Sequence, residues 1–369
     1  MSRRIDPTGD LVRRILTCSW RQDPSPVSFS QEELTAALPM LLGSGAGALT
    51  WWKIRNSSLG AHPAAAEFRQ AYRHNSISAA VREIEIKEVF ALFRSNGIEP
   101  LMIKGWSAAR PYPEPGLRPY GDIDLVVQDQ DYKKAVEVHK SLGVKKFNID
   151  LEHSEITALD SRSIADFFAR SQVVSLGGSE IRVLSPEDHL RVICIHTLKH
   201  GVWRPLWLCD IAAAIESAPA DFDWDYCLGP NNRQRRWILS AVLLSGELLG
   251  AYLKNTPAVT LPSKQPGWLI PTILKQWAEP YPAIQEYNRH RAPMISYLRN
   301  PKGLITDLRN RWPNPIAATI DLGGQLNGLP RLPFQAGNCV VRAAKFLVHL
   351  PSQLSGSGGQ GSGVREENS

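Results

Sequence analysis

The feature that most constrains the fold is the stretch at residues 121–127, with the sequence GDIDLVV. In a strand, successive side chains point to opposite faces, so Asp122 and Asp124 share one face while Ile123 and Leu125 share the other. The apolar face must pack against a core. The acidic face must stay open or bind cations, because a buried and unpaired carboxylate is costly. The stretch therefore predicts a strand at the border between a core and a polar site.

The segments around this stretch alternate between helical and extended patterns. Apolar residues recur at helical spacing on either side of it, and Gly97 supplies a stop for the helix that precedes it. Short apolar runs bounded by Gly and Pro are typical of strands. The expected helices are residues 76–96 and 132–141, and the expected strands are residues 100–103, 123–127 and 144–151.

The pattern changes on both sides of this α/β core. Residues 8–60 favour short helices, with Ser30 as the N-cap of a helix that Gly43 ends. From Ser185 on, a Ser-Pro-Glu helix start leads into long apolar-periodic stretches. We expect an α+β fold with a small mixed sheet, N-terminal helices and a C-terminal helical domain. The expected boundaries are 1–75, 76–184, 185–350 and a Gly/Ser-rich disordered tail at 351–369.

Composition narrows the class of protein. A net charge of +6 and a pI of about 9.1 favour anionic ligands such as nucleotides or nucleic acids. The five cysteines form no CxxC pair, so neither a disulfide framework nor a cysteine zinc site is indicated, and a reducing cytoplasm is expected. The apolar stretch at 36–52 is interrupted by Pro and Gly, so we predict no membrane span. No obligate protein partner is evident.

The segment before the acid pair favours a functional role for Asp122 and Asp124. Taken alone, Asp-Ile-Asp also fits a strand start with two solvated acids. Upstream, however, Gly105 would let a phosphate approach backbone N–H groups, and Lys104 and Ser107 would add a positive charge and a hydroxyl. A turn suited to a triphosphate, followed by two carboxylates suited to bridge two Mg²⁺ ions, predicts phosphoryl-group chemistry.

Several motifs together resemble a known family. They are Ile103-Lys104-Gly105, Tyr112-Pro113, Leu117-Arg118-Pro119, Gly121-Asp122-Ile123-Asp124, Leu184-Ser185-Pro186-Glu187-Asp188, His196, Lys199-His200, Trp203 and Leu208-Cys209-Asp210-Ile211. The chain resembles the bacterial family of uncharacterised nucleotidyltransferases in the DNA polymerase β-like superfamily, over roughly residues 35 to 255. The resemblance implies a nucleotidyltransferase core at 76–184, with Asp122 and Asp124 holding two Mg²⁺ ions and an NTP, expected to be ATP, as substrate.

The resemblance also implies a third carboxylate, on a strand after the acid pair. Glu155 in the stretch Glu155-Ile156-Thr157-Ala158 is our first candidate, and Glu152 is the alternative. The chain departs from the superfamily pattern at Trp106, where Ser or Gly is usual after the glycine of the turn. Arg118 is the first candidate for clamping phosphates or orienting the acids, and Arg110 is the second. Ion pairing with Glu114 or with the aspartates is the alternative.

His196 and His200 lie four residues apart on one helix face, a spacing that also occurs in metal sites. Without an evident third ligand, a polar layer or a position facing the nucleotide is the better interpretation. The leading hypothesis is transfer of an NMP from an NTP to an acceptor that is a small molecule, a peptide or RNA, with release of pyrophosphate. The alternative is a nucleotide- or RNA-binding module with the same fold and impaired turnover.

Overall fold

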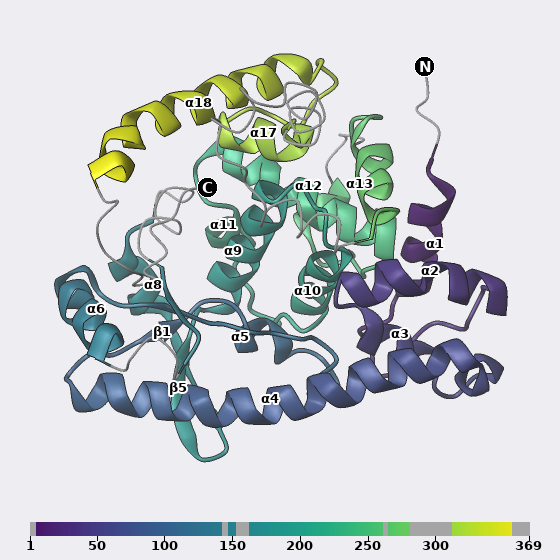
Figure 1. Ribbon diagram of the computed structural model, residues 1–369, viewed down its shortest axis with the longest axis horizontal. Helices are drawn as coiled ribbons and strands as arrows, with labels where there is room; N and C mark the ends of the chain where they lie inside the picture. The colour runs from purple at the N-terminus through teal and green to yellow at the C-terminus, as the bar shows by residue number, and fades with distance from the viewer. Residues whose placement is uncertain (1–4, 142–146, 153–161, 261–264, 281–311, 356–369) are drawn as a thin grey trace.

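The computed structural model describes residues 5–141, 147–152, 162–260, 265–280 and 312–355. The chain begins with a group of helices that pack against the helical part further along (Figure 1). The expected helix start at Ser30 is confirmed: its hydroxyl accepts the N–H of Glu33, and the Glu33 carboxylate accepts the N–H of Ser30. The first elements are α1 (Pro7–Leu16), α2 (Gln31–Gly43), α3 (Gly47–Ile54), η1 (Ser58–Ala61) and α4 (Pro63–Ser95).

A five-stranded mixed sheet follows, in the order β3-β2-β1-β5-β4. β1 runs antiparallel to β2 and parallel to β5, and β2 runs parallel to β3. This confirms the expected α+β fold with a mixed sheet. Its elements are β1 (Leu101–Met102), α5 (Trp106–Ala109), β2 (Ile123–Val126), η2 (Asp129–Asp131), α6 (Tyr132–Ser141), β3 (Ile149–Leu151), α8 (Ile164–Arg170), β4 (Gln172–Leu176) and β5 (Ser179–Val183).

The hairpin of β4 and β5 was not part of the prediction. Its turn is Gly177-Gly178, and both residues have positive φ, at 52° and 85°. A Gly-Gly pair between two extended runs is a recognised hairpin signal, so the sequence did contain the information. The hairpin places β5 beside β1 and thereby puts β1 in the middle of the sheet.

Different helices pack against the two faces of the sheet. Ile123 and Leu125 pack in a cluster with Phe90 and Phe93 of α4, on one face. Val126, from the alternate position of β2, packs with residues of α8 on the other face. Because Asp122 and Asp124 have the same parity as Val126, the acidic face of β2 turns away from α4.

The helix predicted at 76–96 is the second half of α4, which begins at Pro63 and has 33 residues. Ile77, Val81 and Ile84 are among the apolar residues whose helical spacing led to this prediction, but they are 68%, 50% and 53% exposed. The reason is length: at about 1.5 Å per residue the helix spans about 50 Å, so it crosses from one hydrophobic cluster to another. Figure 1 shows α4 running across the lower part of the molecule, and the expected boundary after residue 75 falls inside it.

The helical part builds the larger core. Residues of α1, α2 and α3 share one hydrophobic cluster with the helices after residue 185. Among the described residues, no helix is long and apolar enough to cross a membrane. The elements are α9 (Pro186–Lys199), α10 (Pro205–Glu216), α11 (Trp224–Leu228), α12 (Asn232–Leu249), η3 (Pro257–Thr260), α13 (Leu269–Trp277), α17 (Pro315–Asp321) and α18 (Leu332–Ser355).

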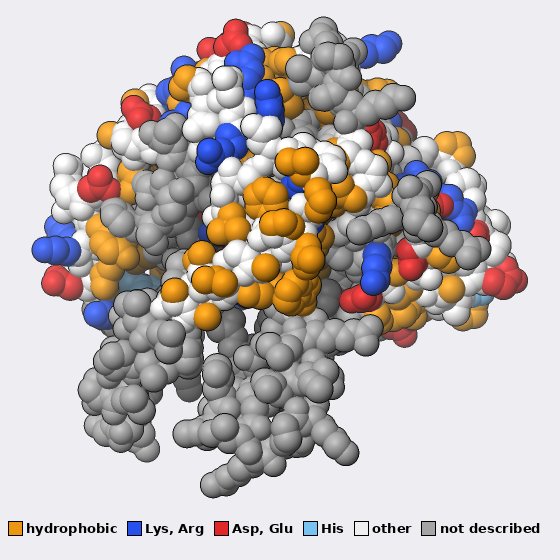
Figure 2. Space-filling model, turned by 90° about the horizontal axis from the view of Figure 1, so that it is seen from above, with side chains coloured by type: hydrophobic (Ala, Val, Ile, Leu, Met, Phe, Trp, Pro, Cys, Tyr) orange, Lys and Arg blue, Asp and Glu red, His pale blue; other side chains and the backbone are white. Residues whose placement is uncertain are grey.

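Apolar side chains also reach the surface. Seen from above, a band of them crosses the middle of the molecule (Figure 2). Near the C-terminal end, Leu329, Leu332 and Val340 are each more than half exposed.

Candidate active site

Three aspartates gather where β2 and β3 lie side by side. The two strands are parallel, and Asp124 is in register with Asp150. Asp122 lies two residues before Asp124 and shares its face. One carboxylate oxygen from each of the three lies within 4.8 Å of the others. Asp124 is only 5% exposed, whereas Asp122 and Asp150 are open to solvent. We call these three residues the aspartate cluster.

Burial and crowding make the charge on Asp124 costly. Burial raises the pKa of Asp124 to about 6, Lys104 opposes this rise, and Asp122 and Asp150 add to it. The Lys104 ammonium lies 3.4 Å from the Asp124 carboxylate and also pairs with Glu152. A divalent cation would offset the remaining repulsion directly, and hard oxygen ligands of this kind suit Mg²⁺.

The turn after β1 comes close to the cluster. Gly105 has φ 60° and ψ −116°, a conformation that residues with a Cβ rarely adopt. A Cβ at this position would lie 3.1 Å from the Asp122 carbonyl oxygen and 3.5 Å from a carboxylate oxygen of Asp124. Glycine therefore allows the turn to approach both acids.

Two side chains near the turn are polar or charged. Ser107 is buried, and its hydroxyl has no hydrogen-bond partner among the described residues. Such a group is costly unless something satisfies it. Arg110 is exposed, and its guanidinium lies 5.7 Å from the centre of the Trp106 ring. The hydroxyl of Ser107 is thus buried and unsatisfied, while Arg110 lies on the surface near Trp106.

Arg118 is held in a buried ion pair. Its guanidinium donates to both oxygens of Asp210, at 2.9 Å for the shortest bond, and Tyr112 donates its hydroxyl to the same carboxylate at 2.7 Å. Arg118 also donates to the backbone carbonyls of Pro119 and Gly105, at 3.3 and 3.5 Å. The pair therefore ties α10 to the loop and turn that carry the candidate site.

His196 and His200 lie together at the C-terminal end of α9. Their ring centres are 4.4 Å apart, and each is in contact with Trp207. Burial, and then nearby positive charges that include Lys104 and Arg118, lower the pKa of His196 well below its ordinary value. The ring of His196 is consequently neutral at neutral pH.

The sequence pattern of a family described as uncharacterised nucleotidyltransferases matches residues 44–250, more than half of the chain. The chain belongs to this family. The matched region contains the aspartate cluster, the Gly105 turn, the Arg118–Asp210 pair and both histidines.

Comparison with solved structures gives one distant similarity, and comparison with curated proteins gives no match. A solved structure titled as an antigenic nucleotidyltransferase-like protein from Paracoccidioides brasiliensis is similar over 45% of this chain and 87% of that chain, with a TM-score of 0.36 and 15% identity. No curated protein matches the sequence.

The structure offers a new candidate for the third carboxylate that we expected beside Asp122 and Asp124. Glu155, the first choice from sequence, lies outside the described residues. Glu152 is buried and pairs with Lys104. Asp150 was not considered from sequence, although it stands between Ile149 and Leu151, on the polar face of the expected strand. What was missing was the parallel, in-register pairing of β3 with β2, which only the fold supplies.

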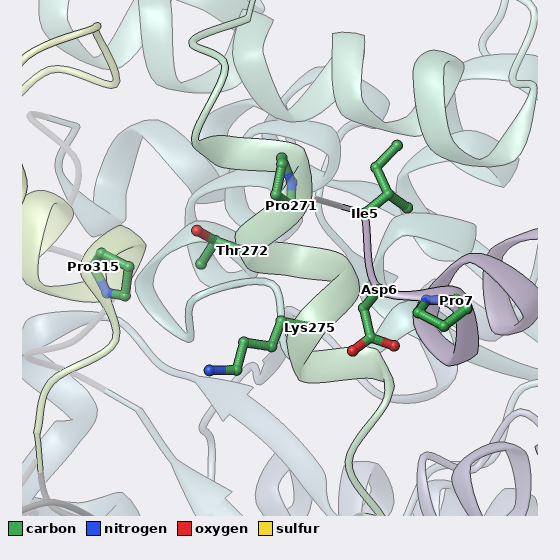
Figure 3. A pocket seen from close by; sticks show the side chains of 7 residues that line it. All are labelled: Ile5, Asp6, Pro7, Pro271, Thr272, Lys275 and Pro315. Atoms are coloured by element: carbon green, nitrogen blue, oxygen red, sulfur yellow. The ribbon is translucent and has the colours of Figure 1, made fainter. Parts of the chain in front are cut away.

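A hollow on the described surface lies away from the aspartate cluster. It has a volume of about 710 Å³, and residues that line it include Asp6, Lys275 and Pro315. Figure 3 shows them coming from the start of the chain and from α13 and α17. None of its lining residues belongs to the sheet or to the aspartate cluster, so the candidate site rests on the carboxylates and not on this hollow.

Proposed function

We propose that the protein is a metal-dependent nucleotidyltransferase that moves an NMP from an NTP to an acceptor and releases pyrophosphate. The observation that carries the proposal is the aspartate cluster, in a member of a nucleotidyltransferase family. Asp122, Asp124 and Asp150 would hold two Mg²⁺ ions. When bound, the two ions would neutralise the triphosphate and favour deprotonation of the acceptor.

The fit of the cluster to divalent cations can be judged from its charges. Three carboxylates lie together, and Lys104, which offsets part of their charge, is shared with Glu152. Mg²⁺ prefers carboxylate oxygens at about 2.0–2.1 Å, and two-metal sites place their ions about 3.5–4 Å apart. Carboxylate oxygens within 4.8 Å of one another are compatible with both requirements.

The other residues prepare the substrate position. Gly105 lets the turn approach Asp122 and Asp124, so that its backbone N–H groups would meet the triphosphate. The buried Ser107 hydroxyl, which has no partner among the described residues, would donate to a phosphate oxygen. Lys104 stays beside Asp124 and adds positive charge. Arg118 keeps the turn in place through its bonds to Asp210 and to the Gly105 carbonyl. His196 and His200 face the nucleotide from α9.

Asp150 takes the role that we expected of Glu155 or Glu152. Asp124 and Asp122 adjoin the turn that receives the triphosphate, whereas Asp150 comes from the neighbouring strand. Asp150 therefore serves the acceptor side, where no triphosphate helps to anchor the metal and an extra carboxylate is needed. ATP is the first nucleotide to test, and the acceptor is a small molecule, a peptide or RNA.

The experiment compares wild type with Asp150→Asn and with Asp131→Asn, which changes a carboxylate of η2 that is outside the cluster. Each is incubated with labelled NTPs, Mg²⁺ and a cell extract, and pyrophosphate release and label transfer are measured. We expect Asp150→Asn to keep NTP affinity within severalfold and to lose at least about a hundredfold in transfer, or about 2.7 kcal/mol. Asp131→Asn should behave as wild type.

Two outcomes would contradict the proposal or part of it. If Asp150→Asn transfers as fast as wild type, Asp150 is not the third acid, and Glu155→Gln and Glu152→Gln are the next variants. If wild type binds NTP but releases no pyrophosphate with any acceptor in a broad screen, the chain is a nucleotide-binding module without turnover.

A further inference from the structure

Four aromatic side chains form a cluster where α9 ends and α10 begins. His196 comes from α9, His200 is the C-cap residue of that helix, Trp203 comes from the connection and Trp207 from α10. The ring centres of Trp203 and Trp207 are 5.0 Å apart, and those of His196 and Trp207 are also 5.0 Å apart. His200 is exposed, and the other three are partly exposed. We call these four residues the aromatic cluster.

The local backbone explains why the rings meet. The chain reverses between the two helices through Gly201 and Val202, both with positive φ, at 71° and 59°. Pro205 then starts α10. His196 lies in the last turn of α9 and His200 is its C-cap residue, four positions later, so their rings lie on one side of the helix end. Trp203 lies in the connection just before α10, and Trp207 lies in its first turn. The reversal therefore turns two aromatic pairs toward each other.

The aromatic cluster lies beside the candidate active site. Arg204, between the two tryptophans, donates to the Ser44 carbonyl at 2.8 Å. A Cβ on Gly45 would lie 2.5 Å from the Arg204 guanidinium and 3.3 Å from the ring of Pro119, which precedes Asp122 by three residues. On its other side, His196 is near enough to Lys104 for that charge to act on its pKa. Lys104 in turn contacts Asp124.

The chemistry of the aromatic cluster suits a base better than a phosphate. Two indole rings carry no charge, and the ring of His196 is neutral. Flat aromatic surfaces bind nucleobases by stacking, and they do so with little discrimination because every base has a π-face. The anionic part of a nucleotide has its own partners at the aspartate cluster and the Gly105 turn.

We propose that the aromatic cluster stacks on the base of the NTP whose triphosphate is bound at the aspartate cluster. The inference rests on the proposed function and adds the way in which the nucleotide is recognised. It implies that the enzyme accepts more than one base, because stacking alone reads no hydrogen-bonding pattern.

The experiment measures the binding of the base and the binding of the triphosphate separately. Binding of ATP with Mg²⁺, of inorganic tripolyphosphate with Mg²⁺, and of adenosine without metal is measured by calorimetry or saturation-transfer NMR. The variants are Trp207→Leu and His200→Ala, the second being at an exposed ring. The control is Trp224→Leu, which removes an indole in contact with Phe222 in another part of the molecule. Thermal unfolding verifies that each variant is folded.

We expect Trp207→Leu to weaken ATP and adenosine binding about tenfold and to leave tripolyphosphate binding unchanged within about twofold. His200→Ala should weaken ATP binding severalfold, and Trp224→Leu should leave the binding of ATP and of adenosine unchanged. Equal loss for ATP and tripolyphosphate would show a structural role and overturn the inference, as would ATP and adenosine binding that is unchanged in both variants.

Two further outcomes separate this inference from the proposed function. If wild type does not bind tripolyphosphate with Mg²⁺, the proposed function fails, and adenosine binding that Trp207→Leu abolishes still supports the aromatic cluster as a base site. If Trp207→Leu weakens the binding of a single-stranded oligonucleotide without 5′-phosphates but not the binding of ATP, the cluster binds an acceptor base. The inference about the NTP is then wrong.

Discussion

Asp124 is the residue on which the electrostatics of the site depend. Its carboxylate is buried, pairs with Lys104 and lies beside Asp122 and Asp150. Burial raises its pKa to about 6. Near neutral pH the metal-free protein therefore holds a buried negative charge that the unfolded chain would expose to water. Functional sites commonly contain groups perturbed in this way, because the ligand supplies the missing counter-charge.

We predict opposite effects of Asp124→Asn in the absence and presence of metal. Between pH 4 and 6 the folded wild type binds a proton at Asp124 that the unfolded chain has released, so its free energy of unfolding falls as pH rises through this window. Metal-free Asp124→Asn should lack this fall and be more stable than wild type at pH 7, by on the order of 1–3 kcal/mol.

Adding Mg²⁺ with a non-hydrolysable NTP should make wild type more stable than Asp124→Asn. Wild type gains stability from a ligand that binds only the folded state, about 2.7 kcal/mol at a hundredfold excess over the dissociation constant. Asp124→Asn, and likewise Asp122→Asn, should lose most of that gain in melting temperature. Equal gains in wild type and variants would rule out the metal assignment.

At the scale of elements, the turn between β1 and α5 brings backbone and carboxylates together. Its position depends on Gly105 and on the Arg118–Asp210 pair, which connects the loop before β2 to α10. A buried pair of this kind is weak evidence for stability, since desolvation offsets much of the attraction. Its geometric role is clearer: it fixes the turn relative to the helical part.

Gly105→Ala and Gly121→Ala form a matched pair of variants flanking the site. At Gly105 a Cβ meets the Asp122 carbonyl oxygen at 3.1 Å, and the backbone has φ 60°; at Gly121 a Cβ meets nothing within 4 Å. We expect Gly105→Ala to lower the free energy of unfolding by about 1–3 kcal/mol and to weaken NTP binding. Gly121→Ala should stay within about 0.5 kcal/mol of wild type. Urea unfolding provides the measurement, and similar effects of both substitutions would show that the turn is not strained.

For the whole molecule, the main feature is that distant parts of the chain share one core. Leu11 and Ile15 of α1 belong to the same cluster as Ile273 of α13 and Leu248 of α12. α4 joins this cluster to the one beneath the sheet. The regions expected at 1–75 and 185–350 therefore meet in a common interior, and we propose that they unfold together.

The substitution Gly9→Ala tests whether the two regions share one core. α1 approaches α13 so closely that a Cβ on Gly9 would lie 1.8 Å from the Leu274 carbonyl oxygen. The helices must separate to admit the methyl group, and we expect a loss of about 1–3 kcal/mol with a single cooperative urea transition. Thr8→Ala, at the neighbouring half-exposed position, is the control. A variant as stable as wild type, or an early separate transition, would contradict a shared core.

Local patterns were enough to predict a large part of the molecule. Strand periodicity alone places Asp122 and Asp124 on one face, and the capping pattern at Ser30 predicts the start of α2; both depend on residues within a few positions of each other. Helix length was harder to predict. The start of α4 at Pro63 and the exposure of Ile77 depend on where two cores lie, which a periodic pattern does not contain.

Contacts between remote residues needed the tertiary structure. Asp150 joins Asp124 because β3 pairs in parallel with β2, and Arg118 meets Asp210 across 92 positions of sequence. The aromatic cluster comes beside the aspartates only when α10 packs near the loop before β2. The sequence by itself determined the strand, its acid pair and the alternation of helices around them, because these follow from short-range geometry. Which carboxylate joins the acid pair, which residue pairs with Arg118 and which aromatic rings meet at the end of α9 were decided by packing, because each depends on how separate elements meet in space.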